Sequence, residues 1–316
     1  MSDVTTMRAI GQDVLGGPEV LREVRLERPE PRPNEVLVRV RAAGVNPTDW
    51  KHRATGGFLG EPPFVLGWDV SGEVAATGIG VAEFEPGDEV FGMLPYPFGH
   101  GSHAEYVIAP VRALWHKPAS VDHVQAGALP LVSLTAWQAL TERAGVRAGQ
   151  RVLVHAAAGG VGHVAVQIAK AHGAHVIGTA SAAKHGFLRE IGVDEPVDYR
   201  STDVTEAVRD VDVVLDTLGG ETALRSLRVL RPGGILVSIL PVGSRELYDE
   251  AERLGVRAVR MLVDADRAGM RSVTELVESG ELKASIAGTY PLAGAAKAHE
   301  QGETGHTTGK LVLLVD

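Results

Sequence analysis

A run of small residues in the middle of the chain has the types and spacing that bind a dinucleotide. The apolar segment Val152–Val154 leads into a turn that reads Ala157-x-Gly159-x-x-Gly162, and a helical pattern follows. In such a turn the first small residue allows a tight bend, the second lets the backbone approach a pyrophosphate, and the third lets the helix pack on its strand. The N–H groups of a helix N-terminus also favour phosphate. We therefore expect a pyrophosphate to bind at Ala158, Gly159, Gly160, Val161 and Gly162.

The end of the next predicted strand indicates which dinucleotide binds. Sites that prefer NAD place Asp or Glu there, where the acid binds the adenosine ribose. Here the strand 175–179 is followed by Ser181-Ala-Ala-Lys184, which contains no acid. A hydroxyl and an ammonium suit the dianionic 2′-phosphate of NADPH. We expect Ser181 and Lys184 to bind that phosphate, the alternative for Lys184 being a solvated residue on the next helix.

Composition restricts the chemistry further. The 316 residues include no cysteine, which excludes disulfides, a cysteine nucleophile and thiolate-bound metal sites. One suggestive cluster, His100, His103 and Glu105, lies in a loop rich in glycine and proline, where such histidines are more often solvated, and we expect no metal. The net charge of −9 argues against nucleic acid or an acidic membrane as partner. Without a signal-like or membrane-length apolar segment, a cytoplasmic protein is expected.

Two kinds of structure are needed to position these residues. Up to about Val124 the pattern is β-type, with alternating valines at 36, 38 and 40 and short apolar runs separated by turns. A helical segment at 124–144 then precedes an alternation of strands and helices. We expect strands at 152–155, 175–179, 197–199, 211–216, 235–240 and 256–263, and helices at 162–172, 183–191, 222–230 and 245–254.

Six strands with helical crossovers predict an α/β fold with a doubly wound parallel sheet of the Rossmann type. A helix at 267–279 and a strand at 310–315 follow, and we expect both to rejoin the first domain. Residues 124–263 would then form an NADP-binding Rossmann domain that is inserted in a β-rich, partly open barrel made of residues 1–123 and 264–316.

Motifs spread through the chain resemble those of the medium-chain dehydrogenase/reductase (MDR) superfamily. Within it they resemble the zinc-free quinone oxidoreductase group, which includes the zeta-crystallins and the enone reductases. Besides the glycine-rich turn, the motifs are Ala43–Trp50, Val65–Val74, Phe84–Phe91, Leu129–Trp137, Asp216–Gly219 and Gly309–Leu313. The resemblance implies that the β-rich part is a GroES-like domain that binds substrate.

One departure from the zinc enzymes of this superfamily bears on the reaction. Zinc alcohol dehydrogenases carry Gly-His-Glu where this chain reads Gly67-Trp68-Asp69. Without a Lewis acid a simple ketone is not polarised. The resemblance therefore implies an NADPH-dependent, zinc-independent oxidoreductase that transfers hydride to a quinone or to the C=C bond of an α,β-unsaturated carbonyl. The alternatives are a non-catalytic, crystallin-like NADPH-binding protein and a ketone or enoyl-thioester reductase of a biosynthetic pathway.

The resemblance also assigns further cofactor contacts. Tyr199 would bind the 2′-phosphate together with Lys184. The residues expected around the nicotinamide and its ribose are Asn46, Thr135, Leu218, Leu240 and Val242. Two of these assignments have alternatives, because Asn46 could merely close the turn before Pro47, and Lys310 could either reach the cofactor or cap the last strand.

Catalysis in this group depends mostly on orientation, together with a donor near the substrate carbonyl and a proton source. Some enoyl-thioester reductases of the superfamily use a tyrosine shortly after the Asn-Pro segment, but the comparable stretch here offers Phe58, which weakens that alternative. The remaining candidates are Tyr96, Lys51 and Asp49. Tyr96 lies between two prolines, which would stiffen its loop, and the alternative is an aromatic residue that only packs that loop.

The last predicted strand of the sheet, 256–263, suggests an assembly. The resemblance places it at the sheet edge, where unpaired N–H and C=O groups can pair with a second copy. We expect a homodimer formed across a two-fold axis there. The alternative is a monomer in which the helix at 267–279 covers the edge.

Overall fold

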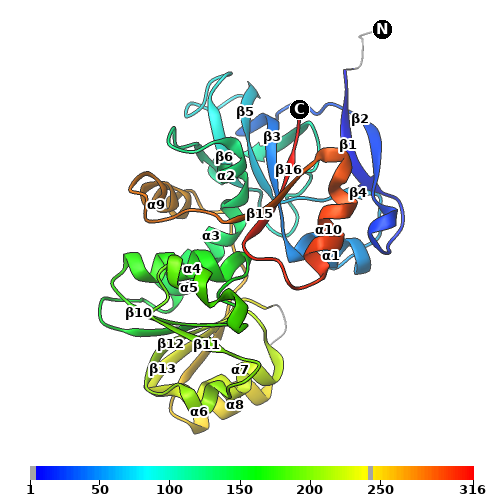
Figure 1. Ribbon diagram of the computed structural model, residues 1–316. Coiled ribbons are helices and arrows are strands. Elements are labelled where there is room, and N and C mark those ends of the chain that lie inside the picture. The colour runs from blue at the N-terminus through cyan, green and yellow to red at the C-terminus, as the bar shows by residue number, and fades with distance from the viewer. Residues whose placement is uncertain (1–4, 241–244) are drawn as a thin grey trace. The chain divides into compact units, whose positions relative to one another are not determined.

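The computed structural model describes residues 5–240 and 245–316 of the chain (Figure 1). The chain divides into two compact units. Unit 1 contains Met1–Leu131, Asp264–Glu278 and Lys283–Asp316, and unit 2 contains Val132–Val263 and Ser279–Leu282. Among the described helices of both units, none combines the length and the apolar character needed to cross a membrane.

Unit 1 is built around β3, whose valines at 36, 38 and 40 are all buried, as their alternation predicts. One side of β3 pairs with β5, and the other side pairs first with β7 and then with β16. The strands of this sheet are β3 (Glu35–Val45), β5 (Asp69–Thr77), β6 (Glu89–Met93), β7 (Tyr106–Pro110), β8 (Leu114–His116), β15 (Ile286–Pro291) and β16 (Lys310–Leu314). A smaller sheet contains β1 (Thr6–Gln12), β2 (Arg22–Glu27) and β4 (Phe64–Val65).

The pairing of β16 with β3 brings the end of the chain beside its first third. Leu311 lies opposite Val45, so that Lys310 stands next to Asn46. The α-helices that lie wholly in the described part of unit 1 are α1 (Pro47–Thr55), α2 (His123–Ala128), α9 (Arg267–Glu278) and α10 (Ala295–Glu303). The helix expected at 267–279 is thus α9, and the strand expected at 310–315 is β16.

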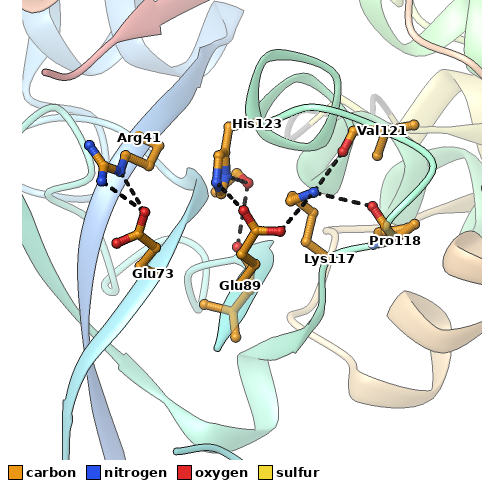
Figure 2. A network of polar contacts seen from close by, with 9 residues as sticks. Arg41, Glu73, Glu89, Lys117, Pro118, Val121 and His123 are labelled. Carbon is orange, nitrogen blue, oxygen red and sulfur yellow. Dashed lines mark hydrogen bonds and ion pairs between the residues drawn. The ribbon is translucent and has the colours of Figure 1, made fainter. Parts of the chain in front are cut away.

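Ion pairs fix the start of α2 against the sheet, as Figure 2 shows. The carboxylate of Glu89 lies 3.2 Å from Lys117 Nζ and 3.0 Å from His123 Nε2. Lys117 Nζ also donates to the backbone oxygen of Val121 at 2.6 Å, and His123 Nδ1 lies 2.8 Å from Ser71 Oγ. The turn before α2 is therefore held to both β5 and β6, although Glu89 is too exposed for its ion pairs to contribute much stability.

Unit 2 contains the predicted six-stranded sheet, and all of its strand pairs are parallel. The strand order is β11-β10-β9-β12-β13-β14, the doubly wound arrangement. The strands are β9 (Arg151–Val154), β10 (His175–Ala180), β11 (Glu195–Asp198), β12 (Val211–Asp216), β13 (Leu230–Ser238) and β14 (Arg257–Arg260). The helices are α4 (Gly160–Ala171), α5 (His185–Glu190), α6 (Val204–Ala207), α7 (Gly220–Ser226) and α8 (Arg245–Arg253).

Two elements differ from the sequence-based expectation. The single helix expected at 124–144 is divided into α2, α3 (Pro130–Trp137) and a π-helical segment, Gln138–Arg143, because Pro130 lacks the N–H needed to continue α2. The strand expected at 256–263 is only four residues long. Its partner β13 ends at Ser238, opposite Arg260, so the ladder ends there.

Candidate functional site

The glycine-rich turn has the geometry that a pyrophosphate requires. Gly159 is the N-cap residue of α4 and brings no side chain to cap its first N–H groups. A Cβ atom added to Gly162 would lie 2.2 Å from the backbone oxygen of Ala156, so only glycine permits this packing of helix on strand. At Gly159 the nearest atom to an added Cβ is 3.1 Å away. The free helix start and the close backbone approach fit a phosphate group.

The residues expected at the 2′-phosphate lie close together. Ala180 pairs with Asp198, so Ser181 and Tyr199 leave two adjacent strands at the same edge of the sheet. Burial lowers the pKa of Lys184, while Tyr199 acts in the opposite direction and Arg200 adds to the lowering, so all three are near neighbours. The guanidinium of Arg200 lies 5.8 Å from the centre of the Tyr199 ring. Arg200 was not among the expected site residues, although its position beside Tyr199 was a signal for it.

The loop after β12 is held by Asp216, which is fully buried. Asp216 Oδ1 accepts hydrogen bonds from the N–H groups of Leu218, at 3.0 Å, and Gly219, at 2.8 Å. Leu218 is half exposed, and Leu240 packs so close to Gly219 that an added Cβ would lie 2.6 Å from its Cδ1 atom. Thr135 is buried on α3. Val242 lies outside the described residues.

In unit 1, three buried residues from distant parts of the chain form one polar network. Asn46 Nδ2 donates to Asp69 Oδ2 at 2.8 Å, and Lys310 Nζ donates to Asn46 Oδ1. Lys310 Nζ also donates to the Val45 backbone oxygen at 3.0 Å and lies 3.4 Å from Asp69 Oδ2. The second oxygen of Asp69 accepts the Leu131 N–H at 2.6 Å. The amide of Asn46 and the ammonium of Lys310 are thus both engaged inside unit 1.

Asp49 joins this network from the first turn of α1. Its carboxylate accepts the Asn46 N–H at 2.6 Å and the Gly67 N–H at 3.1 Å. Burial raises the pKa of Asp49 to about 7, against the opposing effects of these hydrogen bonds and of Lys310. Burial also raises the pKa of Asp69 and lowers that of Lys310. Lys51, the other acid–base candidate on α1, is exposed and has no place in this network.

Asp69 was not among the residues expected at the site. Its sequence signal was the Gly67-Trp68-Asp69 motif, which bears on zinc chemistry and does not reveal the partners of the acid. Asn46 is the N-cap residue of α1, but its amide makes the hydrogen bonds to Asp69 and Lys310 described above.

Tyr96 belongs to an aromatic cluster, also in unit 1. Thr48 Oγ1 donates to the Tyr96 hydroxyl at 3.1 Å, which leaves the phenolic O–H to donate elsewhere. The Tyr96 ring lies 5.4 Å from that of Trp68, 6.1 Å from that of His52 and 6.2 Å from that of Phe58. Phe58 is 47% exposed, and burial raises the pKa of Tyr96. The cluster therefore presents an exposed ring beside a phenol that stays protonated at neutral pH.

The residues of the suggested metal cluster make separate contacts. His100 Nδ1 lies 2.6 Å from the Val65 backbone oxygen, His103 is hydrogen-bonded to the backbone of Gly44, and Glu105 pairs with Arg8 at 2.8 Å. Trp68, at the place of the zinc-binding histidine, donates its indole N–H to the Pro97 oxygen at 3.1 Å. Within residues 5–240 and 245–316, no three His, Cys, Asp or Glu side chains are placed to hold a metal ion together. This donor set does not fit zinc.

Comparisons with known proteins agree with this architecture. Residues 32–119 match the alcohol dehydrogenase GroES-like domain, and residues 191–313 match the zinc-binding dehydrogenase family. The human mitochondrial NAD(P)H oxidoreductase RTN4IP1 is 33% identical, with 90% of this chain and 82% of the relative covered.

Two solved structures are similar over almost the whole chain. The quinone oxidoreductase from Coxiella burnetii superposes with a TM-score of 0.94 and 37% identity, covering 99% of this chain and 100% of that one. The Escherichia coli quinone oxidoreductase complexed with NADPH has a TM-score of 0.88 and 29% identity, with coverage of 98% and 100%.

Proposed function

The chain belongs to the quinone oxidoreductase-like group of the medium-chain dehydrogenase/reductase superfamily, and we propose that it transfers hydride from NADPH to a quinone or to the C=C bond of an α,β-unsaturated carbonyl, without a metal. The coarser activity, that of a nicotinamide-dependent oxidoreductase, follows from its relatives, one of which is named as an NAD(P)H oxidoreductase. The choice of NADPH and of the substrate class is our proposal.

The observation that carries the proposal for NADPH is the group of Ser181, Lys184, Tyr199 and Arg200 at one edge of the unit 2 sheet. Two cations, a hydroxyl and a phenol can donate to a dianionic phosphate, and Ser181 stands where an NAD site has an acid. The uncapped start of α4 would hold the pyrophosphate. When bound, NADPH would supply the hydride.

Tyr96 and Phe58 support the proposed substrate class. The phenolic O–H of Tyr96 is left free to donate because the hydrogen bond from Thr48 occupies its oxygen. It can donate to the carbonyl oxygen of a quinone or enone, where negative charge develops as the hydride arrives. The exposed ring of Phe58 offers a flat apolar surface for a planar substrate.

Zinc independence is part of the same proposal. Trp68, His100 and Glu105 each contact a different group and do not converge on one point, and the chain has no cysteine. An enone or quinone is electron-poor without a Lewis acid, so a positioned hydrogen-bond donor can suffice.

The test is the oxidation of NADPH and of NADH, each with a set of quinones and a set of enones, before and after exhaustive chelation. We expect turnover with NADPH that chelation leaves unchanged. Replacing Tyr96 by phenylalanine should lower kcat roughly 100-fold, since one positioned donor contributes about that much. Metal found in stoichiometric amount, with activity lost on its removal, would refute zinc independence. NADPH binding without turnover of any substrate would favour the crystallin-like alternative.

A further inference from the structure

We infer that His155 is a positioning residue for the cofactor site: with Thr179 it holds the backbone of Ala156, from which the phosphate-binding turn starts. The inference rests on the proposed function only in taking this turn as the cofactor site. His155 follows β9 directly, Thr179 lies on β10, and both are 98% buried. Neither was expected to have a role.

The hydrogen bonds define the state of the imidazole. Ser226 Oγ donates to the Thr222 backbone oxygen at 2.6 Å, so its oxygen must accept from His155 Nε2, which lies 2.8 Å away. Nε2 therefore carries the proton, and Nδ1 has a lone pair. Thr179 Oγ1, 3.2 Å from Nδ1, donates its hydroxyl proton to that lone pair.

Thr179 is also hydrogen-bonded to the backbone of the phosphate-binding turn. Its Oγ1 accepts the Ala156 N–H at 3.1 Å, and its backbone oxygen accepts the Ala157 N–H at 2.9 Å. Ala156 has a φ of +46°, the left-handed region that residues other than glycine seldom adopt. Such a conformation persists only where its surroundings enforce it. The hydrogen bonds that Thr179 accepts from the N–H groups of Ala156 and Ala157 provide that enforcement, and His155 orients the Thr179 hydroxyl.

Ala156 also determines where α4 begins. Its backbone oxygen accepts the Gly159 N–H at 2.8 Å and is the atom against which Gly162 packs. A rotation of the Ala156 backbone would therefore move Gly159 and the first turn of α4 together. The neutral imidazole fits this role, because burial lowers the pKa of His155 to about 4, with a smaller opposing effect from Asp216.

Two pairs of variants test the inference. Thr179→Val and His155→Phe keep the shape but remove the hydrogen bonds, whereas Thr179→Ser keeps the hydroxyl and His155→Asn places an oxygen near the position of Nδ1. We expect the first pair to weaken NADPH and NADH equally, by roughly 10-fold in Kd and in KM, with kcat at saturating cofactor retained. The second pair should bind both cofactors nearly as wild type does.

Thr274→Val is the matched control, because Thr274 is also a buried threonine whose hydroxyl donates a hydrogen bond, here to the Met270 backbone oxygen in α9 of unit 1. It should lose thermal stability without losing cofactor affinity. If His155→Phe does not fold, the comparison of Thr179→Val with Thr179→Ser still tests the inference. Wild-type affinity in Thr179→Val, or equal losses in Thr179→Val and Thr179→Ser, would overturn the inference.

Failure of the proposed function would look different. Lys184→Ala should weaken NADPH alone, and a wild-type protein that binds neither cofactor would refute the proposed function and this inference together. Normal cofactor binding by the wild type, with unchanged affinity in both Thr179→Val and His155→Phe, would refute this inference only.

Discussion

The two units each bury a polar network, and the two networks are built from different chemistry. In unit 1, Asn46, Asp49, Asp69 and Lys310 combine two carboxyl groups with an ammonium. In unit 2, the network of His155, Thr179 and Ser226 is neutral, and each of its hydrogen bonds joins an uncharged donor to an uncharged acceptor. Removing one partner of a buried charge leaves that charge unpaired in the protein interior, which is strongly destabilising. A neutral group that loses one hydrogen bond leaves no charge unpaired. The charged network should therefore be the more sensitive to substitution.

The largest expected effect is that of Asp69→Ala. The change leaves the ammonium of Lys310 buried without its carboxylate and removes the acceptors of Asn46 Nδ2 and the Leu131 N–H. We expect the free energy of unfolding to fall by about 3–5 kcal/mol, measured by urea denaturation. Ser226→Ala, in the neutral network, should cost only about 1 kcal/mol. Equal losses of unfolding free energy in Asp69→Ala and Ser226→Ala would contradict the expected difference between the two networks.

A matched double variant sharpens this test. Exchanging the two side chains, Asn46→Asp with Asp69→Asn, keeps the charge of the network and an acceptor for both Lys310 Nζ and the Leu131 N–H. We expect it to be clearly more stable than Asp69→Ala. A double variant as unstable as Asp69→Ala would mean that shape, rather than charge pairing, decides the stability of this network.

A charge at the surface of unit 2 should act on the ligand and not on folding. Lys184→Ala removes the phosphate contact that we propose for NADPH, worth ~1.5–3 kcal/mol, so Kd for NADPH should rise roughly 10–100-fold. Kd for NADH and the urea midpoint should hardly change, because NADH carries no 2′-phosphate. Titration of cofactor fluorescence measures both affinities. Equal losses for NADPH and NADH would instead give Lys184 a structural role.

The two units should also differ in how their stability depends on pH. Burial lowers the pKa of His155 and of His103 to about 4, below the ordinary value of 6.5. The unfolded chain therefore takes up protons first, and the stability present above pH 6.5 is lost as the pH falls toward 4, by about 2 kcal/mol for one such histidine between pH 7 and pH 5.

In unit 1, Asp49 opposes this loss of stability at low pH. The pKa of Asp49 is raised to about 7, so its carboxyl favours folding at low pH and loses that contribution as the pH rises from 4 to 7. Replacing His155 by asparagine should therefore flatten the acid limb of the stability curve, and replacing Asp49 by asparagine should steepen it. Unfolding measured at pH 5 and pH 7 for both variants would show whether these opposite changes occur.

The smallest effect on folding is expected at β14, the last strand in the order of the parallel sheet, where we propose the homodimer. The Met261 N–H donates to the Ser238 backbone oxygen of β13, so by alternation along β14 the Val259 N–H points to β13 and the Ala258 N–H points away from it. Ala258→Pro should leave the fold intact but halve the mass measured by light scattering. Val259→Pro is the contrasting variant and should destabilise unit 2 itself. A wild-type monomer, or a dimer that Ala258→Pro leaves unchanged, would refute this interface.

The sequence by itself determined the features that depend on local spacing. The turn Ala157-x-Gly159-x-x-Gly162 predicts both the strand before it and the helix after it, and the alternation of strands and helices predicts a parallel sheet, which unit 2 has. Ser181 and Tyr199 were also within reach of the sequence, because parallel strands end at the same edge and bring the residues that follow them together.

Only the tertiary structure decided which buried polar groups meet. Lys310 reaches Asn46 across 264 positions because β16 pairs with the end of β3, and no local pattern specifies that pairing. Nothing in the sequence distinguishes Asp69 or His155 as a member of a buried network: Asp69 is an acid after Trp68, and His155 is one histidine among twelve. Their roles arise from burial, since a polar group removed from water must find its partner among whatever side chains the fold brings near it.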